Sequence, residues 1–135
     1  MRRLFILFCL CCCLCTVANA QDYVATFNGF HDGKQFEFTV TPAHLENSPE
    51  WPGEQDNPPL AARRALAIAS DYLPKLVTNV EKWEARAIRL HPVREKWIYV
   101  VEFSERREGV QAAFVIVVLM NGEVVEPKIT KRKLS

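Results

Sequence analysis

A run of eight residues near the C-terminus constrains the fold more than any other feature of the chain. Residues 113–120 read Ala-Phe-Val-Ile-Val-Val-Leu-Met, so both alternating rows of a strand built from them are apolar. Leaving such side chains in water costs about 1.5 to 3 kcal/mol for each of the larger ones. The run therefore predicts a central strand that is covered on both of its faces.

A helix can cover one face of this strand, so a second cover must come from elsewhere in the chain or from a second copy. Residues 23–40 contain Phe27, Phe36 and Phe38, which otherwise have no core to join. We expect this segment to fold back over the strand. A monomer is for that reason favoured over a two-fold dimer.

Four stretches with the period of a strand follow one another and are joined by short turns. They are residues 84–91, 96–105, 110–120 and 123–129. Short connections between consecutive strands are typical of an antiparallel meander. The pair Asn121-Gly122 predicts a two-residue hairpin turn in which both residues have a positive φ.

A helix is predicted before these strands. Asn57 suits its N-cap and Pro58 its first turn. At about 100° per residue, one face collects Ala62, Ala65, Leu66, Ala69, Leu73, Leu76, Val77 and Val80. The apolar residues after Pro74 fall on the same helical face as those before it. This predicts a single helix with a kink at Pro74. The fold class is therefore α+β: one long helix packed on a four-stranded antiparallel meander, with an N-terminal strand or hairpin.

Charge and proline divide the chain into two parts. Residues 21–57 carry seven acidic side chains and one basic, whereas residues 58–135 carry 14 basic and nine acidic. We expect an acidic, proline-rich N-terminal segment over 21–57, with a hairpin made from 23–27 and 36–40, and an α+β domain over 58–135. The whole chain has 17 basic and 16 acidic residues, a balance that predicts no bulk attraction to nucleic acid.

The first 20 residues have the pattern of a secretory signal peptide. Arg2 and Arg3 precede 14 uncharged residues, and Ala18 and Ala20 are the small residues that favour cleavage. A stretch of this length is too short to cross a hydrocarbon core of about 30 Å as a helix. We expect cleavage after Ala20 and a secreted or periplasmic location. All five cysteines lie in the first 15 residues, so the mature chain is expected to lack disulfides.

Part of the chain, about residues 60–127, resembles PepSY-type domains. The resemblance is carried by the helix Ala-Leu-Ala-Ile-Ala-Ser-Asp-Tyr-Leu at 65–73, the strand Trp-Ile-Tyr-Val-Val-Glu-Phe at 97–103, and Leu-Met-Asn-Gly-Glu-Val-Val at 119–125. It implies a role in binding or inhibition outside the cell. The order of elements is also similar to the cystatin-like fold, although residues 91–95 lack the Gln-x-Val-x-Gly hairpin of inhibitory cystatins. Neither resemblance assigns a catalytic residue.

Residues that might carry catalysis or bind a metal do not form a recognisable motif. His31 and His44 lie among acidic residues, but their spacing matches no metal-ligand pattern, and His91 precedes a proline as a turn residue. The four serines after residue 20 lie in neither a Gly-x-Ser-x-Gly elbow nor a Ser-x-x-Lys helix. We therefore expect no catalytic residue, cofactor or metal.

Two kinds of side chain remain as candidates for contact with a partner. The basic C-terminus either binds an anionic polymer or forms a frayed, solvated tail. The tail is the favoured alternative. Trp51, in the acidic loop, would anchor that loop to the domain or insert into a partner, with the anchor favoured. Ile68 and Tyr72 lie on the side of the predicted helix that is expected to face solvent. The candidate contact residues are Trp51, Ile68, Tyr72, Lys128, Lys131, Arg132 and Lys133.

The sequence favours a small exported binding or interaction domain without enzymatic activity, whose protein partner is unknown. One alternative is a small-ligand carrier or an enzyme that uses a pocket between helix and sheet. Against this alternative, the side chains that the helix and the sheet are predicted to direct into such a pocket are apolar or aromatic. They supply no acid, base or nucleophile. The other alternative is a subunit of an extracellular assembly.

The expected processing can be measured directly. The exported chain should begin at Gln21 and melt at the same temperature with and without a thiol reductant, because every cysteine has been removed with the signal. Intact mass and a melting curve test the two statements. A lipidated cysteine at the N-terminus would contradict both.

Overall fold

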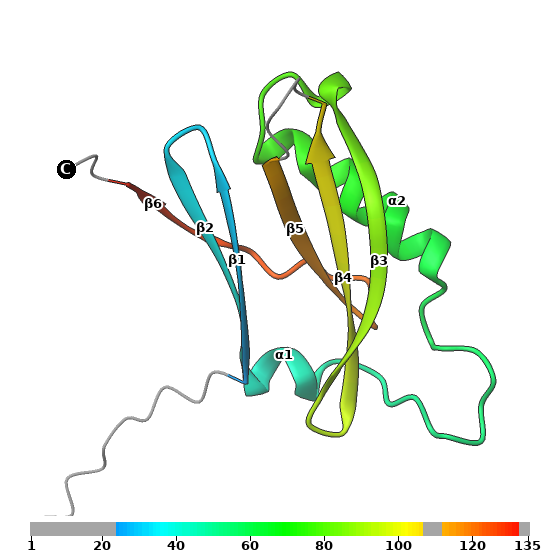
Figure 1. Cartoon of the computed structure of the whole chain (residues 1–135). Coiled ribbons are helices and arrows are strands. Elements are labelled where there is room, and N and C mark those ends of the chain that lie inside the picture. Colours follow the sequence, from blue (N-terminus) through cyan, green and yellow to red (C-terminus); the bar gives the residue numbers. More distant parts are fainter. Residues whose placement is uncertain (1–23, 107–111, 133–135) are drawn as a thin grey trace, which may run out of the picture.

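The computed structural model describes residues 24–106 and 112–132, which form two three-stranded antiparallel sheets (Figure 1). One sheet has the order β1-β2-β6, with β1 at Ala25–His31, β2 at Lys34–Val40 and β6 at Lys128–Lys131. The other has the order β3-β4-β5, with β3 at Trp83–Val93, β4 at Lys96–Glu105 and β5 at Ala112–Leu119. The helical elements are α1 (Pro42–Glu46), α2 (Ala62–Tyr72) and the 3₁₀ turns η1 (Leu73–Lys75) and η2 (Val80–Lys82).

The expected fold class, one long helix on a four-stranded meander, is wrong. The meander ends after three strands, because residues 123–129 do not form one continuous fourth strand. Val124 makes a single bridge to Val118, and Val125 donates its N–H to the carbonyl of Val117. Pro127 has no N–H with which to extend this pairing. The chain then leaves β5, and β6 pairs with β2 in the other sheet.

The long helix was also predicted wrongly, at both of its ends. Pro58 and Pro59 do not open it; α2 begins at Ala62, after a segment whose Leu60 carbonyl accepts a 2.6 Å hydrogen bond from the hydroxyl of Tyr99. Burial raises the pKa of that hydroxyl. At the other end, Pro74 cannot donate to the preceding turn, so the helix gives way to the 3₁₀ turn η1 after 11 residues.

The turn after β5 is longer than the predicted two-residue hairpin. The N–H of Gly122 donates to the carbonyl of Leu119, and the N–H of Leu119 donates to that of Glu123. Gly122 has a φ of 88°, whereas Asn121 is not among the positive-φ residues. The loop thus has three residues and ends in a left-handed glycine, and the Asn121 side chain accepts from the N–H of Glu123.

A hairpin is present in the N-terminal segment, but residues 25–31 pair with residues 34–40 where 23–27 and 36–40 were expected, and residue 23 lies outside the described residues. β1 and β2 are joined by Asp32 and Gly33, with φ values of 50° and 68°, which is the geometry of a tight two-residue turn. The predicted loop that follows contains the short helix α1. Its N-cap Thr41 and its third residue His44 form a reciprocal capping box, in which the Thr41 N–H donates to His44 Nδ1.

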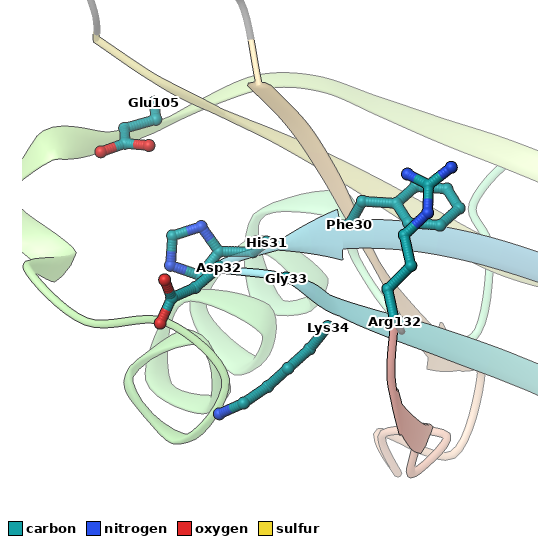
Figure 2. A pocket seen from close by; sticks show the side chains of 7 residues that line it. All are labelled: Phe30, His31, Asp32, Gly33, Lys34, Glu105 and Arg132. Carbon is teal, nitrogen blue, oxygen red and sulfur yellow. The ribbon is translucent and has the colours of Figure 1, made fainter. Parts of the chain in front are cut away.

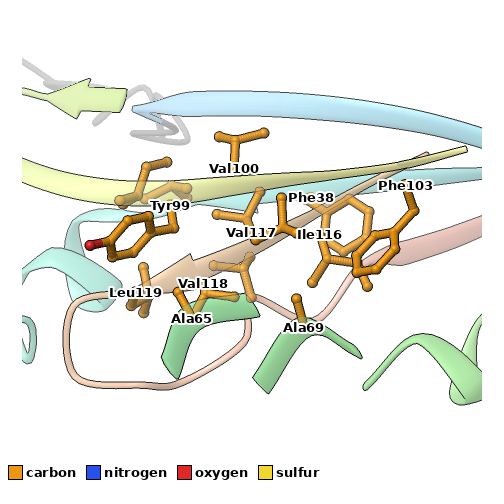
Figure 3. Close-up of a cluster of buried hydrophobic side chains, with 14 of the residues drawn as sticks. Phe38, Ala65, Ala69, Tyr99, Val100, Phe103, Ile116, Val117, Val118 and Leu119 are labelled. Atoms are coloured by element: carbon orange, nitrogen blue, oxygen red, sulfur yellow. The ribbon is translucent and has the colours of Figure 1, made fainter. Parts of the chain in front are cut away.

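The N-terminal hairpin packs over β5, in agreement with the expectation that the apolar residues 113–120 need a second covering element. Phe36 and Phe38 are fully buried, and their rings meet the ring of Phe114 edge-on at centroid distances of 5.0 and 6.0 Å. Figure 3 shows the hairpin strands and α2 on opposite sides of β4 and β5, with Ala65 and Ala69 of α2 directed at the sheet. Both alanines are at 0% exposure, so small side chains let the helix approach closely.

The contact between hairpin and sheet should depend on the absence of a side chain at Gly29. A Cβ placed there would lie 2.9 Å from Cδ2 of the buried Phe114 ring, which is closer than van der Waals contact permits. Gly29→Ala is expected to lower the free energy of unfolding by about 1 to 3 kcal/mol. Gly53→Ala is the matched control, because nothing lies within 4 Å of its Cβ. Chemical denaturation that ranks the two variants equally would contradict this packing.

Candidate functional site: a basic strand edge

Trp51 lies against the domain and holds the acidic loop in place. Its ring meets Trp97 of β4 at a centroid distance of 5.6 Å, and its Nε1–H donates to the carbonyl of Gln55 at 2.8 Å. Lys96 fixes the same loop by donating to the carbonyl of Ser48 at 2.7 Å. The indole thus contacts both the domain, through Trp97, and its own loop, through Gln55.

Ile68 and Tyr72 are half-buried on α2 and lie in different surroundings. Ile68 packs near Gly122, whose Cβ would be 3.5 Å from its Cδ1. Tyr72 helps line an open hollow of about 520 Å³ with His44, Val124 and the acidic Glu123 and Glu126. Burial and the charge of Glu126 both raise the pKa of the tyrosine hydroxyl. The charged side chains that line this hollow are the two acidic ones.

The basic C-terminus is a strand of the first sheet, not a frayed tail. Lys128 and Lys131 lie within β6, which pairs with β2, and the N–H of Arg132 donates to the carbonyl of Gly33 at 2.9 Å. Lys133 lies outside the described residues. The pairing places Lys34 of β2 directly opposite Lys131. Lys34, Lys128, Lys131 and Arg132, all exposed, are called the basic edge below.

The basic edge brings like charges together. Lys34 and Lys131 form a cross-strand pair that is not hydrogen-bonded, because the bonds lie at the flanking residues, and side chains are closest at such positions. Like charges directly opposite one another destabilise a sheet. Lys128 faces Glu37, but within the part of the chain that the structure describes no basic-edge residue forms an ion pair.

Two large apolar side chains accompany the basic edge. Ile129 is 52% exposed although its cross-strand neighbour Phe36 is buried, and Phe30 is 49% exposed. The Arg132 guanidinium lies over the ring of Phe30, 5.8 Å from its centroid. A ligand that meets this edge would therefore find cations and apolar surface side by side.

A hollow of about 240 Å³ adjoins the basic edge at the tip of the hairpin (Figure 2). It is lined by Phe30, His31, Asp32, Gly33, Lys34, Glu105 and Arg132. The His31 ring meets the buried Trp83 edge-on at 5.1 Å, and Glu105 is 5% exposed. The described residues of this lining carry neither a hydroxyl nor a thiol, the side chains of serine and cysteine nucleophiles.

The two histidines considered as metal ligands lie at opposite ends of the hairpin. His31 ends β1 near the turn, whereas His44 lies in α1 after the end of β2, where its Nδ1 accepts from Thr41 (Figure 1). Among the described residues, no three His, Cys, Asp or Glu side chains are grouped so that they would hold a metal ion. The described helices are each too short or too polar to cross a membrane.

Sequence reasoning missed Phe30, Lys34 and Glu105 as neighbours of the basic C-terminus. Lys34 is the one base in residues 21–57, which was the available signal, but nothing in the order of residues pairs it with Lys131. No family model matches the chain, and no curated protein or solved structure matches it significantly. The resemblance to PepSY-type and cystatin-like proteins thus has no support from these comparisons.

The anchoring role of Trp51 predicts a stability effect. Trp51→Ala should lower the free energy of unfolding by about 1 kcal/mol, through loss of the ring pair with Trp97. Trp51→Phe keeps a ring and loses the hydrogen bond to Gln55, so its effect should be smaller. Thermal and urea denaturation measure both. A Trp51→Ala chain as stable as the parent would contradict the anchoring role.

Proposed function

We propose that this chain is an exported, non-enzymatic binding domain that uses the basic edge to hold an acidic segment of a protein partner. The observation that carries the proposal is the pairing of Lys34 with Lys131 on one face of the sheet, next to Arg132, whose side chain lies on the other face. Carboxylates of a partner placed near Lys34 and Lys131 would reduce the repulsion between these two side chains. Part of the favourable electrostatic energy would therefore arise only when the partner binds.

The surroundings of the cations favour a polypeptide over an anionic polymer. A polysaccharide or phosphate backbone is recognised mainly through its charge and makes few contacts with aliphatic side chains. Ile129 and Phe30 expose about half of their surfaces beside the cations, which suits a segment with both acidic and apolar side chains. Heparin is the anionic polymer against which this choice is tested.

Export and the absence of catalysis enter the proposal from the sequence. Arg2, Arg3 and the uncharged stretch that follows have the pattern of a signal peptide, and they lie outside the described residues. The serines lie in no nucleophile motif, and the mature chain would have no cysteine. A binding domain is the simplest function for a chain of this composition.

A charge-reversal experiment tests the surface. Lys131→Glu/Arg132→Glu replaces two cations of the basic edge with two anions, and Arg63→Glu/Arg64→Glu makes the same change on exposed residues of α2. The probe is an immobilised peptide of alternating Glu and Val. We expect the basic-edge variant to bind roughly tenfold or more weakly than the parent, and the α2 variant to bind almost as well as the parent.

Salt and heparin provide the controls. Binding of the peptide should weaken strongly at about 1 M salt, where the Debye length is about 3 Å. An equal loss of affinity in both variants would show that only net charge matters and would contradict the assignment to the basic edge. Tight binding to heparin without binding to the peptide would contradict the choice of a polypeptide partner.

A further inference from the structure

The outer side of β6 presents backbone groups as well as charge. Because the N–H of Arg132 donates to the carbonyl of Gly33, the bonded pairs of this ladder are Arg132 with Gly33, Thr130 with Gln35 and Lys128 with Glu37. The peptide groups of Ile129 and Lys131 therefore point away from β2. Among the described residues no strand pairs with this side of β6.

From this geometry we infer that the acidic partner segment binds as an added strand along β6. The inference rests on the proposed function and specifies how the partner is held. Main-chain hydrogen bonds to Ile129 and Lys131 would supply affinity, and the side chains on the two faces of β6 would supply selectivity. An extended acidic peptide is thus the expected ligand.

The alternation of β6 side chains defines the pattern of that peptide. Lys128, Thr130 and Arg132 lie on one face of the sheet, and Ile129 and Lys131 lie on the other. An antiparallel strand that places an acid opposite each cation and an apolar side chain opposite Ile129 reads Glu-Glu-Thr-Val-Glu. Its second and fourth residues would exchange hydrogen bonds with Lys131 and Ile129.

The same cations argue against a second copy of β6 as the occupant. Lysine on an edge strand protects the sheet from pairing with itself, because two such edges would bring like charges together. In an antiparallel β6–β6 pair centred on Thr130, Lys128 would lie opposite Arg132 of the second copy and Lys131 opposite Ile129, so the two strands would bring six cations together. An acidic strand meets no such repulsion, so the charges that exclude self-pairing also select the partner.

The probe is a capped Glu-Glu-Thr-Val-Glu peptide, compared with the same peptide N-methylated at its second Glu and at its Val. The two have identical charge, but the methylated peptide lacks the N–H groups that would face β6. Strand addition predicts that calorimetry on the parent chain shows methylation weakening binding about tenfold or more. This arm needs no protein variant.

A pair of variants separates backbone from charge on the protein. Lys131→Ala removes the cation and keeps the outward N–H, whereas Lys131→Pro removes both. Proline is tolerated at edge positions whose N–H faces outward. Lys131→Pro should bind about threefold to tenfold more weakly than Lys131→Ala, the effect of one lost hydrogen bond. Hydrogen exchange at Thr130 and Arg132, which bond to β2, verifies that the strand survives.

Hydrogen exchange on the parent chain gives the direct readout. The peptide should slow exchange of the Ile129 and Lys131 amides and leave the already bonded Thr130 and Arg132 amides nearly unchanged. Equal binding by both peptides, without this protection, would overturn strand addition and leave the proposed function standing. A parent peptide that binds no better than Lys-Lys-Thr-Val-Lys would overturn both.

Discussion

The contact of Phe114 with the N-terminal hairpin is the interaction on which the rest of the structure depends. β5 is apolar on both faces, and one short helix covers only one of them. Phe36 and Phe38 close on the Phe114 ring from the hairpin, and Gly29 lets β1 approach that ring. Without this second cover the central strand would expose large apolar side chains, which a domain with a net stability of about 5–15 kcal/mol can hardly tolerate.

The position of the basic edge follows from this arrangement. The hairpin must lie against β5, and the chain that leaves β5 after Val125 crosses to β2 to form β6. The basic residues of the C-terminus are thereby placed beside Lys34, which belongs to the acidic half of the sequence. In Figure 1 the acidic loop after α1 and the basic strand β6 lie at opposite ends of the molecule.

Several elements were predictable because their causes are local. β4 spans Lys96–Glu105 as its alternation indicated, and the Asp32-Gly33 turn joins β1 to β2. The helix was predicted too long, because the period of apolar residues shows which side chains share a face. It does not show whether the backbone hydrogen bonds of a helix can continue. Pro74 breaks the hydrogen-bond ladder, yet the buried Leu73 and Val77 keep the helical phase through a 3₁₀ turn.

The sequence by itself determined that β5 needs two covers, that the hairpin carries the aromatic side chains to provide one, and that the C-terminus is basic. These properties depend on composition and on periods of a few residues. Only the tertiary structure decided that β6 joins β2, that Lys131 faces Lys34, and that the peptide groups of Ile129 point outward. The reason is that register between strands about 90 residues apart is set by packing around Phe114 and Phe36, and no local pattern encodes it.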